Sequence, residues 1–185
     1  MSRSGVPVQL QPRTLACRAA TTWHSDSALL VCSFEYSADP KRAPPTVAER
    51  IDAALGISTT PPRALLGNVD VTWQDESRLH SIELRTGRNQ WEPSSLETPI
   101  GSVEDSSMMF GLDYDVNRVA SIDLDVRILW DAGRSRIALR FGSADAANGR
   151  WVAIADNVFV CVDGQQTLIE IRFESVQIES GDPPN

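Results

Sequence analysis

The sequence predicts a mainly β fold: an antiparallel meander of repeated hairpins, forming a sandwich or a partly open barrel, with one short helix. The first observation is a repeat, because RLHSIEL at 78–84 returns as RVASIDL at 118–124. The second is the alternation of apolar and polar side chains, as in 68–73, which is the period of a half-buried strand. The third is a short polar turn before each copy, which makes successive strands antiparallel.

The individual strands follow from these patterns in chain order. The apolar run at 28–36, rich in aromatic and branched residues, is the clearest strand. A polar turn at 23–27 separates it from a weaker strand before it. The last hairpin turns at Asp163-Gly164, a dipeptide that suits a tight turn because glycine tolerates positive φ. The ranges expected to form strands are 14–22, 28–36, 68–73, 79–85, 112–114, 119–130, 136–141, 151–154, 158–162 and 167–178.

One helix is expected at about 46–55. Thr46 and Glu49 have the spacing of a capping box, in which their side chains satisfy free backbone N–H groups. Gly56 follows as a natural C-terminal stop. The apolar residues recur at helical spacing and predict a stripe that packs on a sheet; they are Val47, Ile51, Ala54 and Leu55.

The 185 residues fit a single domain, residues 1–185, with a sizeable core. Prolines in 1–13 and 180–185 predict loose tails, the first of which is loose or lies at a sheet edge. The polar stretch 88–109 is predicted to be a long loop, and loops of that length are often functional. No apolar run approaches the roughly 18–20 residues of a membrane helix, and the first residues lack a secretory h-region. We therefore expect a cytoplasmic protein that does not bind a membrane.

No motif predicts an enzyme, a cofactor or a metal site. The two histidines, His24 and His80, are not in metal-binding spacing with each other or with a cysteine. The nucleotide-binding glycine patterns and the nucleophile elbow are absent from the sequence. Three cysteines without a CxxC pair favour reduced, buried thiols: Cys17, Cys32 and Cys161. Pairing of Cys17 with Cys32 across a hairpin remains an alternative.

The net charge of −8 is concentrated in the middle of the chain. Residues 70–127 hold 12 acidic and 5 basic side chains, whereas residues 1–69 hold 5 acidic and 7 basic ones. Such a segment repels nucleic acid phosphate and attracts a basic partner. The alternative interpretation is that this acidic segment forms a solvated face with no partner, which maintains solubility.

These observations favour a non-enzymatic protein-binding module, such as an immunity or inhibitor protein that neutralises a basic toxin or nuclease through an acidic sheet face. The sequence also leaves open a homodimer formed through an exposed strand edge. The acids expected to contact the partner lie on outward strand faces and nearby loops; they are Asp75, Glu76, Glu83, Glu104, Asp105, Asp113, Asp115 and Asp123.

The alternative function is a β-barrel-like carrier or sensor of a small apolar ligand. Trp73, Tyr114 and Trp130 occupy similar places before their turns and would line its wall. Recurrent aromatic residues at one repeat position more often belong to the core.

Overall fold

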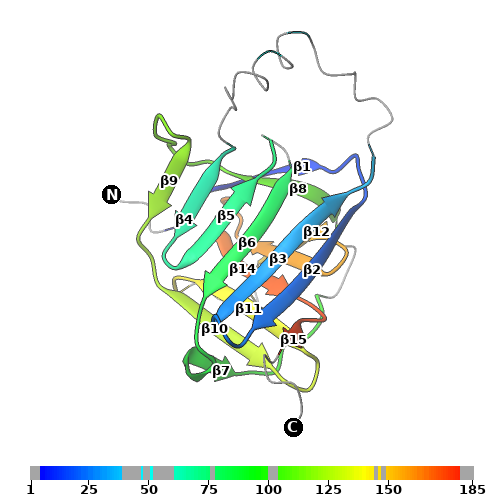
Figure 1. Cartoon of the computed structure of the whole chain (residues 1–185), viewed down its shortest axis with the longest axis vertical. Helices are drawn as coiled ribbons and strands as arrows, with labels where there is room; N and C mark the ends of the chain where they lie inside the picture. Colours follow the sequence, from blue (N-terminus) through cyan, green and yellow to red (C-terminus); the bar gives the residue numbers. More distant parts are fainter. Residues whose placement is uncertain are drawn as a thin grey trace.

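The computed structural model describes residues 5–38, 47, 51, 61–75, 78–99, 104–143, 146 and 149–179. In these residues the protein is mainly β, with two mixed sheets and one 3-10 turn. The two sheets lie one behind the other, and their strands cross (Figure 1). Neither sheet closes into a barrel within the described chain, because each has two terminal strands. The mainly β class and the sandwich arrangement are therefore confirmed.

The first sheet has eight strands. From one edge to the other they are β1 (Val8–Pro12), β8 (Glu104–Phe110), β12 (Arg150–Ala155), β13 (Val158–Val162), β14 (Leu168–Phe173), β11 (Arg136–Phe141), β10 (Val126–Asp131) and β7 (Trp91–Pro93). Its neighbours are antiparallel except for β8 with β12 and β7 with β10, which are parallel. Hairpins supply three of the antiparallel pairs, whereas β1–β8 and β11–β14 join segments distant in the sequence. The β13–β14 hairpin turns over residues 163–167, and Gln166 rather than the expected Gly164 adopts a positive φ, of 60°.

The second sheet has seven strands. In order they are β15 (Gln177–Glu179), β2 (Cys17–His24), β3 (Leu29–Tyr36), β6 (Leu79–Arg85), β5 (Val69–Trp73), β4 (Arg63–Leu66) and β9 (Val119–Ile122). Its two outermost pairs, β15 with β2 and β4 with β9, are parallel. The expected meander is therefore only part of the topology.

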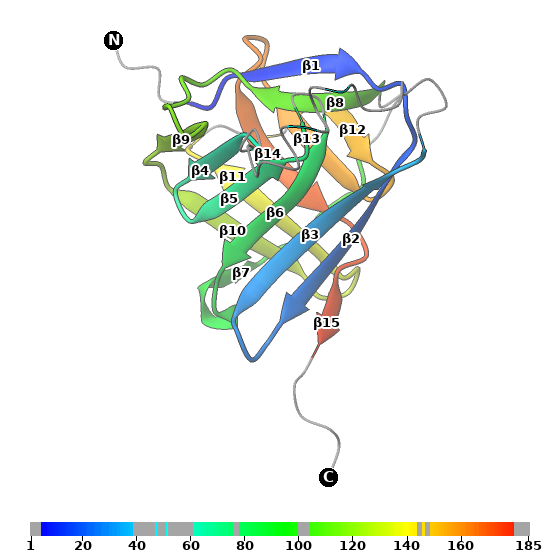
Figure 2. The ribbon, with the colours of Figure 1, turned by 45° about the horizontal axis from the view of Figure 1, so that its top comes forward.

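One hydrophobic core fills the space between the sheets. Figure 2 shows the seven-stranded sheet in front of β10, β11 and β14. Alternate residues of both sheets point inward, as the period of two requires. Trp73 is fully buried there; its indole N–H donates to the carbonyl of Met108 at 2.9 Å, and its ring lies edge-on to Phe110. The core therefore uses Trp73 for packing and satisfies its one polar atom.

The outer face of the eight-stranded sheet is partly covered by residues 94–99, here called the strap. The backbone N–H of Leu96 donates to Asp131 at 2.9 Å, and the carbonyl of Leu96 accepts from Arg134 at 3.0 Å and Arg136 at 2.6 Å. Leu96 itself is buried against the sheet. Contacts between distant side chains and the backbone thus fix the strap.

A buried ion network lies beside the strap. Glu170 is fully buried and accepts hydrogen bonds from Arg140 on one carboxylate oxygen and from Arg172 on the other. Arg172 also donates to the carbonyl of Glu97 in the strap and stacks over Trp151, 4.3 Å from the ring centroid. Two guanidinium groups therefore compensate one desolvated carboxylate.

Several predicted elements differ from those in the structure. The single strand expected over 119–130 is two strands, because β9 ends at the edge of one sheet and β10 begins in the other. Residues 112–114, although described, form no strand. The stretch 88–109 was expected to be a long loop, yet it contains a 3-10 turn, β7 and the start of β8. The N-terminal segment lies at a sheet edge as β1, whereas 180–185 lie outside the described residues.

The helix expected at 46–55 falls almost entirely outside the described residues. Val47 and Ile51 are described, and their side chains are 63% and 50% exposed. These two residues therefore do not pack on a sheet as the apolar stripe predicted.

The alternative pairing of Cys17 with Cys32 is not seen. Cys17 lies opposite Tyr36 in the β2–β3 register, and Cys32 lies opposite Thr21. Both thiols are buried and not bonded to each other. The register pairs His24 with Leu29, so the hairpin is centred between Asp26 and Ser27 rather than midway between the two cysteines, which are therefore not directly opposite.

Candidate functional site

The acids that the sequence singled out are spread over several parts of the molecule. Asp75 lies in the turn between β5 and β6 and pairs with Arg78 at 2.7 Å. Asp105 on β8 pairs with Arg13 at 3.1 Å. Glu76 and the side chain of Glu104 lie outside the described residues. Asp75 and Asp105 are therefore already neutralised by arginines of the same chain.

The outer face of the seven-stranded sheet, which includes Glu83, is nearly balanced in charge. The strand register places four carboxylates, three arginines and one histidine on it; they are Glu35, Asp70, Glu83, Glu179, Arg18, Arg63, Arg85 and His24. Arg63 and Asp70 form an ion pair that raises the pKa of Arg63, first through the hydrogen bond and then through the charge. This part of the sheet face is therefore not the acidic surface that the sequence predicts.

Three of the predicted acids flank the edge strand β9. Asp113 and Asp115 precede β9, and Asp123 follows it with Asp125 two residues later. All four carboxylates are exposed, and no ion pair is found for any of them within the described chain. We call this surface the β9 margin; it consists of Asp113, Asp115, Val116, Asp123 and Asp125. Figure 1 shows β9 at one side of the molecule, as the terminal strand of its sheet.

The tip of the β9 margin is held in a fixed turn. One carboxylate oxygen of Asp115 accepts the backbone N–H groups of Asn117 and Val119, each at 2.8 Å. The backbone of Asp115 also exchanges hydrogen bonds with Arg118 and Val119, and Arg118 adopts a φ of 60°. This side-chain-to-backbone bonding is typical of an Asx turn. The next residue, Val116, is thereby presented to solvent with 98% of its surface exposed.

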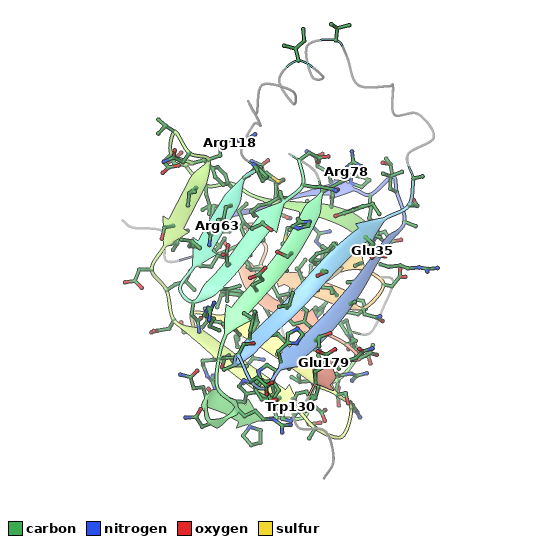
Figure 3. All side chains as sticks on the ribbon, in the orientation of Figure 1. Glu35, Arg63, Arg78, Arg118, Trp130 and Glu179 are labelled. Carbon is green, nitrogen blue, oxygen red and sulfur yellow. The ribbon has the colours of Figure 1, made fainter. Side chains whose placement is uncertain are left out.

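The aromatic residues of the carrier alternative do not gather around one cavity. Trp73 is in the core, and Tyr114 is half-buried next to the β9 margin, where burial raises its pKa. Trp130 packs against Trp91, which in turn contacts Trp23. Figure 3 shows Trp130 at the opposite end of the molecule from Arg118. None of the three hollows found in the described surface is lined by Trp73, Tyr114 or Trp130.

The cysteines have the character of core residues. Burial raises the pKa of the Cys32 thiol to about 12, and it also raises the pKa of Cys17. Raised pKa values keep these sulfurs protonated and weakly nucleophilic at neutral pH. In the described part of the chain, no group of three or more His, Cys, Asp or Glu residues is arranged to hold a metal ion.

Sequence reasoning overlooked two members of the β9 margin. Val116 lies between the polar residues Asp115 and Asn117 of a predicted turn. An apolar residue in that position could have indicated an exposed side chain available for contact with a partner. Asp125 appeared as part of a continuous strand, so its position beyond the end of β9 was hidden.

Comparison of the sequence with protein-family models and with curated proteins finds no match. Among the described residues, no helix is long and apolar enough to cross a membrane.

Proposed function

We propose that the protein is a binding module that captures a basic protein partner through the β9 margin. The observation that carries this proposal is four exposed aspartates at the two ends of an edge strand, none of which forms an ion pair with a described residue, with Val116 protruding between two of them. Charge complementarity speeds association and discriminates among partners. A protruding apolar residue supplies area that loses water on contact.

The rigidity of the tip supports the proposal. Binding is weakened when a loop must be ordered, and the Asp115 turn already orders the residues around Val116. The acids elsewhere differ, because Asp75 and Asp105 would first have to leave Arg78 and Arg13. The aspartates of the β9 margin can therefore contact a basic partner without first breaking an ion pair with a described residue.

An immunity or inhibitor protein of a basic toxin or nuclease is the specific role that we propose. An inhibitor of that kind acts by covering a basic surface and needs no catalytic group of its own. The net charge of −8 favours such a partner over nucleic acid.

The test uses the whole protein as bait for cell lysate, together with two variants of equal charge change. Asp113→Asn, Asp115→Asn and Asp123→Asn are combined in the margin variant, since Asn at 115 keeps the oxygen that accepts the turn N–H groups. Asp26→Asn, Glu35→Gln and Glu97→Gln are combined in the control, because these exposed acids lie away from β9.

The proposal requires one basic protein that is retained by the wild type and the control, lost from the margin variant, and released by salt. Amide resonances of 111–125 must then shift when that partner is added. Equal retention by the margin variant, or shifts confined to other strands, would overturn the proposal.

A further inference from the structure

A polar hollow opens between the end of β1, the residues that follow it, the end of β3 and the residue before β6. In the seven-stranded sheet, β5 and β4 separate β6 from β9. Its volume is about 280 Å³, and Arg13, Thr14, Tyr36, Arg78 and Ser107 are among its lining residues. We call it the guanidinium hollow. A second hollow of about 640 Å³ shares Tyr36 and Arg78 with it. Arg78 is visible at the start of β6 in Figure 3.

We propose that the guanidinium hollow binds a small anionic ligand through an oxyanion group, a carboxylate or a phosphate. This binding site is independent of the proposed capture of a protein at the β9 margin. The proposal depends on the way in which the chain holds its two arginines.

Arg78 is fixed by its inner nitrogen and leaves its outer nitrogens available. Its Nε donates to Asp75 at 2.7 Å, and its backbone N–H donates to the other oxygen of the same carboxylate at 3.0 Å. The two terminal nitrogens have no partner among the described residues, although the side chain is only 21% exposed. A guanidinium held in this way presents a fork of donors, which matches the geometry of a carboxylate or phosphate.

Arg13 is held even more firmly. One terminal nitrogen donates to the carbonyl of Ile154 at 3.0 Å, and the other pairs with Asp105 at 3.1 Å. Its side chain is 8% exposed, whereas that of Asp105 is 65% exposed. The carboxylate partner therefore faces solvent, and the guanidinium lies on the side of the hollow.

The other lining groups add hydrogen-bonding capacity without negative charge. Burial raises the pKa of Tyr36, so its hydroxyl stays neutral, and that hydroxyl accepts the backbone N–H of Leu79 at 2.9 Å. Thr14 and Ser107 contribute further hydroxyls. Among the described residues that line the guanidinium hollow there is no carboxylate; Asp75 and Asp105, which pair with the two arginines, are not among its lining residues. Two oriented guanidinium groups on the wall of a hollow favour an anion over a cation.

The arrangement is also more than a way of closing the β5–β6 turn. A purely structural arginine in a turn gains most by pairing through two parallel hydrogen bonds. Arg127 and Glu92 pair in that manner on the surface, through Nε and a terminal nitrogen. Arg78 donates to Asp75 through its Nε alone, so its two terminal nitrogens remain available to a ligand in the hollow.

The experiment titrates the full-length protein with inorganic phosphate in one arm and succinate in the other, followed by amide and arginine side-chain NMR. The expected result is saturable shifts at Arg13, Thr14, Arg78 and Ser107, with a Kd of about 1 mM or tighter for at least one probe. The arm with the lower Kd identifies the oxyanion as phosphate or carboxylate.

Four variants make the outcome decisive. Arg78→Met should weaken binding about tenfold or more, because a charge-assisted fork is lost, whereas Arg63→Met on the outer sheet face should leave it unchanged. If Arg78→Met fails to fold, Thr14→Val tests the same hollow without touching the β5–β6 turn. The margin variant must still bind the anion, since the two sites are separate. Shifts that never saturate, shifts that map elsewhere, or unchanged affinity in the hollow variants would overturn the proposal.

Discussion

The carboxylate of Asp131 accepts the backbone N–H of Leu96 at 2.9 Å and so connects the end of β10 to the strap. Its other oxygen accepts the backbone N–H of Arg134 at 3.2 Å. Both oxygens of one side chain are thus used by two distant parts of the backbone. These hydrogen bonds, that from Leu96 foremost, lower the pKa of Asp131.

Replacing Asp131 by Asn should loosen the strap. An amide offers one acceptor oxygen in place of two, so one of the two N–H groups loses its partner. We expect the amide of Leu96 to exchange with deuterium faster in Asp131→Asn. Asp163→Asn is the matched control, because Asp163 also accepts two turn N–H groups but does not touch the strap.

The same pair gives a pH dependence with a definite sign. Because the pKa of Asp131 is lower in the folded state, its contribution to stability is complete above the ordinary carboxyl pKa and is lost as the pH falls through the lowered value. The protection factor of the Leu96 amide, which corrects for the intrinsic exchange rate at each pH, should therefore fall in acid relative to that of Gly142, and Asp131→Asn should abolish this difference. Equal changes in the protection factors of both amides would contradict this expectation.

Removing the buried carboxylate of Glu170 should cost more than removing an exposed one. In Glu170→Gln, Arg140 and Arg172 keep their charges in a buried site without the compensating anion. We expect the free energy of unfolding in urea to fall by about 3–5 kcal/mol. Glu92→Gln breaks the exposed pair with Arg127 and should change stability little. Similar losses in both variants would show that burial of the network is energetically unimportant.

Three glycines separate backbone strain from steric crowding. Gly142 has a φ of +65° and open space around its missing Cβ, so Gly142→Ala should cost about 1–2 kcal/mol. Gly67 has a φ of +59°, and an added Cβ would lie 2.4 Å from the carbonyl oxygen of Leu124. Gly67→Ala should therefore cost about 1–3 kcal/mol more. Gly164 has neither feature, and Gly164→Ala should be close to neutral in the same urea titration.

Alkaline pH should destabilise the protein through its buried thiols. The unfolded chain releases the Cys32 proton near pH 9, whereas the folded protein holds it to about pH 12. Since the folded state binds the extra proton between these values, stability falls as the pH rises, by about 1.4 kcal/mol per pH unit. Cys32→Ala should flatten the plot of unfolding free energy against pH above 9. An unchanged slope would show that the thiol ionises while the protein remains folded.

The parts of the fold that the sequence predicted correctly are those determined by neighbouring residues. The β2–β3 and β13–β14 hairpins follow from turns and alternation within about twenty residues, and the structure confirms them. The parallel pairs were missed because they join distant segments; β4 meets β9 with Arg63 opposite Val119. No local pattern encodes which edge receives such a strand.

The candidate site was predictable in composition but not in arrangement. The acidity of residues 70–127 was evident from the sequence. The strand register, however, places Glu83 and Asp70 on a sheet face where arginines offset most of the negative charge. Asp105 forms an ion pair with Arg13, a residue more than ninety positions earlier, which no local pattern could predict. The guanidinium hollow had no sequence signature, because its two arginines, Arg13 and Arg78, are more than sixty positions apart in the sequence and only the fold brings them to one hollow.

The position of β14 has a consequence for biosynthesis. It lies in the interior of the eight-stranded sheet, between β13 and β11, yet every other strand of that sheet precedes it in the chain. A nascent polypeptide therefore emerges with β10 and β11 on one side of a vacant position and β12 and β13 on the other. Until residues 168–173 have left the ribosome, the two halves expose unpaired edges. This sheet can consequently complete its assembly only after residue 173 has emerged, and a stall before residue 168 would leave an aggregation-prone chain.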